Sequence, residues 1–119
     1  MKKITVLVLA CFSFLSFFAN NHINYVKVNT KSSTVKWKGS KITSSHEGGV
    51  SIKEGALAFN HGTLVGGNFI IDLNTITCTD ILKESKNEYF VNHLKNEDFF
   101  DVKKFPEASL QITKVNKLS

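Results

Sequence analysis

Histidine and cysteine are the side chains of this sequence that could bind a transition metal or act as a catalytic base. None of the four histidines forms a pair at the spacing of a zinc motif. Of the two cysteines, Cys11 lies in the apolar N-terminal stretch, which leaves Cys78 alone in the rest of the chain. We therefore expect no metal site and no disulfide framework. His46 and His93 are interpreted as structural or surface residues rather than as catalytic bases.

Two carboxylates, Asp98 and Asp101, have the residue type that general acid and base catalysis needs. They flank Phe99 and Phe100, and at this spacing carboxylates more often hold a turn or face solvent. We expect the two rings to point inward and the charges outward. The sequence has no nucleophile elbow, no Walker A loop and no dinucleotide fingerprint. We predict that the protein is not an enzyme and needs no cofactor.

The charge pattern argues against nucleic acid as a partner. The chain has 119 residues, enough for one domain. All 15 basic residues are lysines, and they are scattered rather than clustered. Lysine lacks the bidentate fork with which arginine reads phosphate and guanine. Nucleic-acid binding is therefore not expected.

The N-terminus is typical of an exported protein. A basic Met1-Lys2-Lys3 precedes an apolar run from Ile4 to Phe18, which predicts a signal peptide over residues 1–19 and a periplasmic or secreted protein with no membrane span after cleavage. One alternative is an uncleaved N-terminal anchor. Another is a lipid anchor on Cys11, because Val8-Leu9-Ala10-Cys11 resembles a lipobox.

Alternating apolar residues after the leader predict a mainly β protein. Asn60-His61-Gly62 is typical of a tight hairpin turn, and Gly66-Gly67 of a bulge or bend. Ile42 to Gly49 is expected to be a loop. Short strands joined by short turns indicate an antiparallel sheet or barrel. The predicted strands are 25–29, 34–41, 50–53, 56–59, 68–76 and 109–113.

One short helix interrupts the strands. Phe90, Val91 and Leu94 have helical spacing within the segment from Glu88 to Leu94. Apolar side chains from the strands, this helix and the turn after it are candidates to line the inside of a curved sheet and contact an apolar ligand, although such residues also fill packed cores. The candidates are Val35, Trp37, Val50, Ile52, Leu57, Phe59, Phe69, Ile71, Leu73, Phe90, Leu94 and Phe99.

The sequence from Val26 to Val115 resembles the YceI-like (polyisoprenoid-binding) family. The resemblance rests on three groups of residues and on their order and spacing. They are Trp37…Gly39…His46…Gly48…Val50…Ile52…Gly55, then Gly66-Gly67-Asn68-Phe69-Ile70-Ile71-Asp72-Leu73 with Ile76 and Asp80, and finally His93-Leu94-Lys95 through Asp98-Phe99-Phe100-Asp101-Val102 to Phe105-Pro106. The resemblance implies an exported bacterial protein with a lipocalin-like antiparallel β-barrel over residues 23–119. The family's later strands are missing from this sequence, so the barrel is expected to be incomplete.

The function implied by the resemblance is binding or carriage of an isoprenoid, a quinone or a similar long apolar chain inside the barrel. Members often form homodimers. A polar end group of the ligand would need a donor at the barrel mouth, for which His46, Ser45 and Asn68 are candidates. Two alternatives remain open: an exported structural or stress-response protein with a packed interior, and an enzyme acting on a lipid or quinone head group with His46 or His93 as base.

Overall fold

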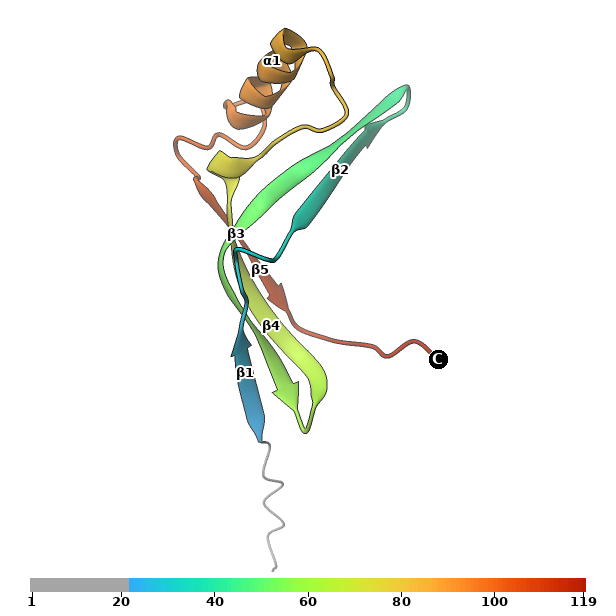
Figure 1. Ribbon diagram of the computed structural model, residues 1–119, viewed down its shortest axis with the longest axis vertical. Helices are drawn as coiled ribbons and strands as arrows, with labels where there is room; N and C mark the ends of the chain where they lie inside the picture. The colour runs from blue at the N-terminus through green and yellow to red at the C-terminus, as the bar shows by residue number, and fades with distance from the viewer. Residues whose placement is uncertain (1–21) are drawn as a thin grey trace, which may run out of the picture.

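The computed structural model describes residues 22–119, so the predicted signal peptide and Cys11 lie outside the described residues. The chain forms an antiparallel sheet with one α-helix at one end (Figure 1). This confirms the mainly β prediction. The elements are β1 (Ile23–Lys27), β2 (Val35–Lys41), β3 (Ser44–Asn60), β4 (Thr63–Asp72), the 3-10 helix η1 (Leu73–Thr75), α1 (Glu84–Lys95) and β5 (Glu107–Ile112).

The long strand β3 organises the sheet. Its second half pairs with β1 on one edge and with β4 on the other, and β5 pairs with β4. Its first half pairs with β2, which forms a hairpin extending toward the helix end (Figure 1). The strand order is therefore β1-β3-β4-β5, with β2 attached to β3 beyond β1.

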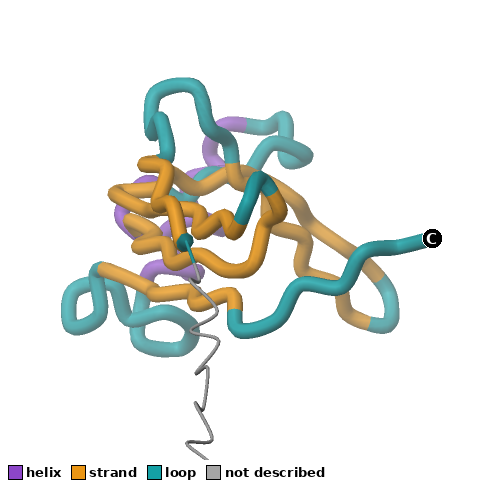
Figure 2. The backbone as a smooth tube through the Cα atoms, turned by 90° about the horizontal axis from the view of Figure 1, so that it is seen from below, coloured by secondary structure: helices purple, strands orange, loops and turns teal. Residues whose placement is uncertain are grey.

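The sheet is strongly curved. Seen along its long axis, it curls into part of a lipocalin-like antiparallel barrel (Figure 2). Register irregularities in β3 fall between Ile52 and Glu54 and between Ala58 and Phe59, and such bulges increase the local bend and twist. Within residues 22–119 the sheet does not close, because β1 and β5 each pair with a single strand.

The turn between β3 and β4 follows the sequence prediction. His61 has a φ of 47° and Gly62 a φ of 80°, so both central residues take the left-handed conformation that a two-residue hairpin requires. The predicted bulge near Gly66-Gly67 is also present, because the register shift opposite Ala58 falls next to Gly66.

Several predicted boundaries are wrong. The strands predicted at 50–53 and 56–59 are parts of one strand, because β3 runs unbroken from Ser44 to Asn60 and only a bulge interrupts its pairing between Ile52 and Glu54. The segment from Ile42 to Gly49 is not a loop: β3 begins at Ser44, and only a short turn separates it from β2. The predicted strand from Asn68 to Ile76 ends at Asp72 instead. There the Asp72 carboxylate accepts a hydrogen bond from the Asn74 N–H and starts the 3-10 turn. The predicted helix is present and longer than expected, as α1.

The segment after η1 runs beside the first half of β3 and satisfies its free backbone groups. The Thr77 N–H donates to the Gly49 carbonyl, and the Thr79 N–H to the Glu47 carbonyl, both at 2.9 Å. In return, side chains accept from β3: Thr77 Oγ1 from the Gly49 N–H at 3.2 Å, and an Asp80 oxygen from the Glu47 N–H at 3.0 Å. This segment thereby takes the place of a neighbouring strand.

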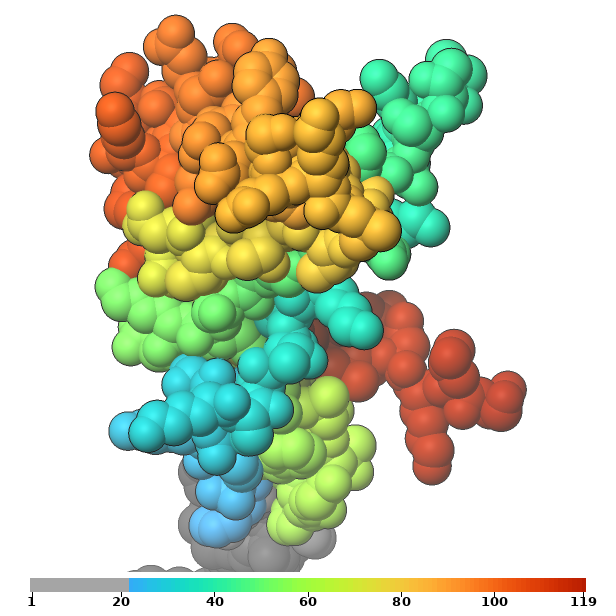
Figure 3. Space-filling view, turned by 45° about the horizontal axis from the view of Figure 1, so that its top comes forward, coloured from blue at the N-terminus to red at the C-terminus, as the bar shows by residue number. Residues whose placement is uncertain are grey.

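The buried side chains gather where this segment, η1 and α1 cover the sheet. Figure 3 shows these parts stacked over the end of the sheet, while the tip of the β2–β3 hairpin stands apart. The opposite end of the sheet has many exposed apolar residues, among them Val26 and Leu110. The buried residues at the covered end are Ile52, Leu73, Ile76, Cys78, Leu94 and Val102.

Candidate functional site

One face of the curved sheet presents a row of apolar side chains. Because directly paired residues of antiparallel strands point to the same side, the register places Val26, Leu57 and Ile112 on one face across β1, β3 and β5. The pairs of Phe69 with Leu110 and of Ile52 with Ile71 lie on that same face. We call this the apolar face.

Two glycines bring large side chains close to the sheet on this face. A Cβ on Gly55 would lie 2.6 Å from a ring carbon of Phe69, and a Cβ on Gly67 would lie 3.2 Å from a methyl carbon of Leu57. Phe69 and Leu57 therefore lie over the bare glycine backbones.

A cavity of about 660 Å³ opens at the middle of the sheet, between the end of β1 and strands β3, β4 and β5. Phe69, Leu110 and Ala56 supply apolar lining, and Lys53 and Asn68 are among its polar groups. This volume lies within the usual range for small-molecule sites. Of the predicted end-group donors, Asn68 borders the cavity, but its alternation with Phe69 places it on the opposite face of the sheet; Ser45 is exposed on the β2–β3 hairpin.

At the other end of the apolar face, aromatic rings connect the hairpin to α1. The Trp37 Nε1–H donates to the Thr77 carbonyl at 2.9 Å. The Trp37 ring stacks on Phe90 of α1 with centroids 6.3 Å apart, and His46 lies 4.6 Å from the same ring. The helix is therefore fixed over this end of the sheet by contacts to both strands of the hairpin.

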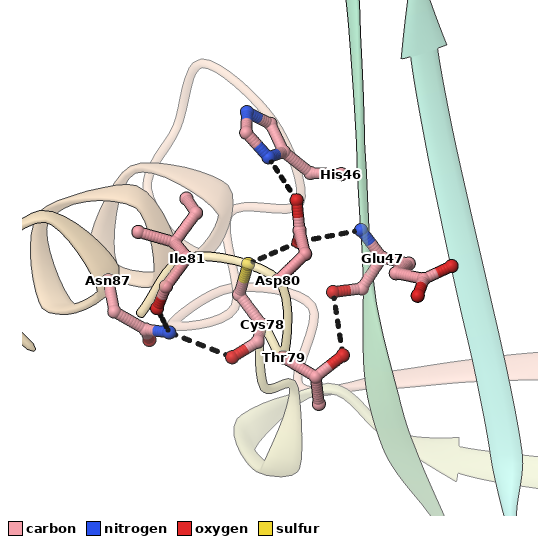
Figure 4. A network of polar contacts seen from close by, with 7 residues as sticks. All are labelled: His46, Glu47, Cys78, Thr79, Asp80, Ile81 and Asn87. Atoms are coloured by element: carbon pink, nitrogen blue, oxygen red, sulfur yellow. Dashed lines mark hydrogen bonds and ion pairs between the residues drawn. The ribbon is translucent and has the colours of Figure 1, made fainter. Parts of the chain in front are cut away.

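Beside these rings lies a polar network (Figure 4). One Asp80 oxygen accepts from the Glu47 N–H and from the Cys78 thiol, and the other lies 2.8 Å from His46 Nδ1. The Glu47 N–H, followed by His46 and Cys78, holds the pKa of the Asp80 carboxyl well below its usual range. Burial, followed by the hydrogen bond to Asp80, raises the pKa of the Cys78 thiol.

Asn87 of α1 fixes the loop that carries this network. Its Nδ2 donates to the carbonyls of Cys78 and Ile81 at 2.8 and 2.9 Å. The sequence gives little sign of this network, since 34 residues separate His46 from Asp80. A site can be inferred from the Cys78-x-Asp80 spacing and the isolated His46 only once the loop is known to run along β3.

The predicted ligand-contacting residues fall into three groups. Those on the strands share the apolar face by register, Leu73 and Leu94 belong to the buried core, and Phe90 packs on Trp37. Phe69 is the member that lines the cavity. The strand residues are Val35, Trp37, Val50, Ile52, Leu57, Phe59, Phe69 and Ile71.

The remaining candidate, Phe99, does not lie on the apolar face as the sequence suggested. Phe99 is 58% exposed and Phe100 46%, so the expectation of inward rings is wrong. Phe99 packs edge-on against His93, whose Nε2 lies 3.1 Å from a carboxylate oxygen of Asp98. The turn is held by its backbone, with the Asp101 N–H donating to the carbonyl of Asn96.

Comparison with known families agrees with this architecture. The model of the YceI-like domain matches residues 26–119. The chain belongs to the YceI-like family. This is a family of polyisoprenoid-binding proteins, not known as enzymes. Comparisons with curated proteins and with solved structures gave no match. Within residues 22–119, no helix has the length and apolarity to cross a bilayer.

Proposed function

We propose that this protein is exported and binds an isoprenoid, or a lipid with a similar long apolar chain, on the apolar face of its curved sheet. The observation that carries the proposal is the apolar face, with Val26 and Leu110 left exposed on it, in a member of a polyisoprenoid-binding family. A long chain gains about 0.8 kcal/mol for each CH₂ that it buries. Such binding needs area rather than reactive groups.

The arrangement of the two ends supports this reading. At the β1–β5 end Val26 and Leu110 of this face remain exposed, and at the other end the Trp37–Phe90 contact closes the face toward α1. An apolar chain would lie along the face between them.

The direct test is mass spectrometry of organic extracts from the purified protein. We expect a long-chain isoprenoid or related lipid to copurify. Protein that is empty after expression under several conditions would contradict the proposal. A fluorescent polyprenyl probe, added to delipidated protein, then gives an affinity for variants.

The matched variants are Val26→Lys and Tyr25→Lys. The two residues are neighbours on β1, both are exposed, and they point to opposite faces of the sheet. A lysine on the apolar face would have to lose water when the probe binds, so Val26→Lys should weaken binding about tenfold or more. Tyr25→Lys should bind as the wild type does. Equal effects of both substitutions would rule out the apolar face as the site.

Export has its own test. A tagged chain expressed in a bacterial host should be found in the periplasmic or secreted fraction, with its N-terminus near residue 20. Retention of a lipid on Cys11, detected by mass spectrometry of the mature protein, would favour the lipid-anchored alternative. A cytoplasmic chain with an intact Met1 would contradict both.

A further inference from the structure

The polar network between β3 and the loop before α1 combines three different metal-binding side chains. One ligating atom each from His46, Cys78 and Asp80 lies within 4.8 Å of the others. We propose that these three residues bind a divalent transition-metal ion, with zinc as the best chemical match. The proposal does not depend on lipid binding, because the network lies beside the apolar face and shares no side chain with the cavity.

The set of donor atoms selects the type of ion. Imidazole nitrogen, thiolate sulfur and carboxylate oxygen are the three ligand types of protein zinc sites. Calcium and magnesium take oxygen ligands, so a site with one sulfur and one nitrogen disfavours both. Three protein ligands leave a fourth position for water. His46 and Asp80 side chains are 35% and 31% exposed, so an ion and its water can reach them.

The geometry requires only a small adjustment. In a tetrahedral zinc site with bonds of about 2.0–2.3 Å, neighbouring ligand atoms lie roughly 3.3–3.8 Å apart. Here His46 Nδ1 lies 2.8 Å and the Cys78 sulfur 3.1 Å from Asp80 oxygens. The two contacts to Asp80 would therefore lengthen by less than about 1 Å. The third pair, His46 and Cys78, already lies within 4.8 Å, so it needs an adjustment of at most about 1–1.5 Å. On binding, the Cys78 thiol proton is released to solvent, and the ion takes the place of the hydrogen bonds between the ligands.

The surrounding contacts hold the ligands in place before an ion arrives. The Glu47 N–H fixes one Asp80 oxygen at 3.0 Å, and the two donations from Asn87 fix the backbone on both sides of Asp80. His46 is held against the ring of Phe90. Such supporting contacts orient metal ligands and raise their affinity. A bound ion would join β3 directly to the loop that leads into α1.

Cobalt titration of the full chain, after removal of metals with EDTA, tests the proposal. We expect one Co²⁺ per chain, with the strong visible absorption of tetrahedral cobalt and a near-ultraviolet thiolate-to-cobalt charge-transfer band. Zinc should displace the cobalt. Cys78→Ser should abolish the charge-transfer band. His46→Gln and Asp80→Asn should each weaken cobalt binding about tenfold or more, as expected for loss of one contact to a metal.

The protein contains a matched control in His93 and Asp98. These residues also form a histidine–carboxylate contact, at 3.1 Å, but His93 and Asp98 belong to no metal-binding cluster in residues 22–119. His93→Gln should leave the cobalt spectrum unchanged. Circular dichroism of each variant without metal checks its fold, and zinc should raise the Tm of the wild type and of His93→Gln but not of Cys78→Ser. Absence of the thiolate band in folded wild-type protein, or its persistence in Cys78→Ser, would overturn the proposal.

Discussion

The two ends of the sheet differ in how the chain covers the apolar face. At the α1 end, the loop from Ile76 to Lys83 and the helix bury the face, and polar groups are tightly paired with the backbone. At the β1–β5 end, side chains of the same apolar character remain exposed. One end is therefore packed for stability, and the other is the end at which we propose that a ligand makes contact. A protein that binds an apolar chain needs both.

The largest difference is expected for truncation of one leucine at each end. Leu94 of α1 is 9% exposed, and Leu110 of β5 is 56% exposed. Leu94→Ala should lower the free energy of unfolding by about 2–5 kcal/mol, because it leaves a cavity in the core. Leu110→Ala should cost less than about 1 kcal/mol, since little area is lost from the folded state. Urea denaturation measures the free energy of unfolding of both variants. A similar loss in the two variants would contradict the proposed difference between the two ends.

The next test adds a methyl group to a glycine at the covered end and to a control glycine on the neighbouring strand. A Cβ on Gly48 would lie 1.7 Å from the Thr77 carbonyl oxygen, whereas one on Gly39 would meet nothing closer than a Trp37 ring carbon at 3.9 Å. Gly48→Ala should lower the free energy of unfolding by about 1–3 kcal/mol or more. Gly39→Ala, on the facing strand, should be neutral. A tolerated Gly48→Ala would mean that the loop does not pack on β3 this closely.

Acid should weaken the covered end through Asp80. Because its pKa is lower in the folded chain than the unfolded value of about 3.9, its stabilising contribution is complete above that pH and is lost as the pH falls through the folded-state pKa. Asp80→Asn should therefore flatten the decline of the urea midpoint on acidification, measured with EDTA present. Parallel declines in the variant and the wild type would show that the network does not favour the charged carboxylate.

The smallest effect is expected from the exposed ion pair of Lys53 on β3 and Glu107 on β5, next to the covered end. Glu107 raises the pKa of Lys53, first through its hydrogen bond and then through its charge. Both side chains are solvent-exposed, and exposed pairs contribute little and are screened by salt. A double-mutant cycle with Lys53→Met and Glu107→Gln should give a coupling near zero at high salt. A large, salt-independent coupling would show that the pair is more ordered than its exposure indicates.

The sequence predicted the parts of the fold that depend on local patterns. Alternation around Trp37 and Phe69 identified strands, and Asn60-His61-Gly62 identified the hairpin. The first residues of β3 escaped prediction because Ser44 to Gly49 have no apolar alternation. They form a strand because β2 pairs with one edge and the loop side chains hydrogen-bond the other.

The site was predicted less completely than the fold. Period-two spacing places Val35, Trp37 and Leu57 on one face, and the register agrees. Phe99 was assigned inward because apolar rings are usually buried, but its position depends on the turn that follows α1. The cluster of His46 with Asp80 depends on a contact between distant segments, which no spacing rule detects.

The loop that satisfies β3 with side-chain oxygens also controls where the sheet can grow. An exposed strand edge is a template on which another chain can add a strand and start aggregation. Along the first half of β3, the N–H groups of Glu47, Gly49 and Ser51 are already taken by Asp80, Thr77 and Thr75. No incoming strand can use them without displacing the loop. Within residues 22–119, strand addition is thereby directed to the outer edges of β1, β2 and β5 and to residues 63–66 of β4, which β5 does not pair.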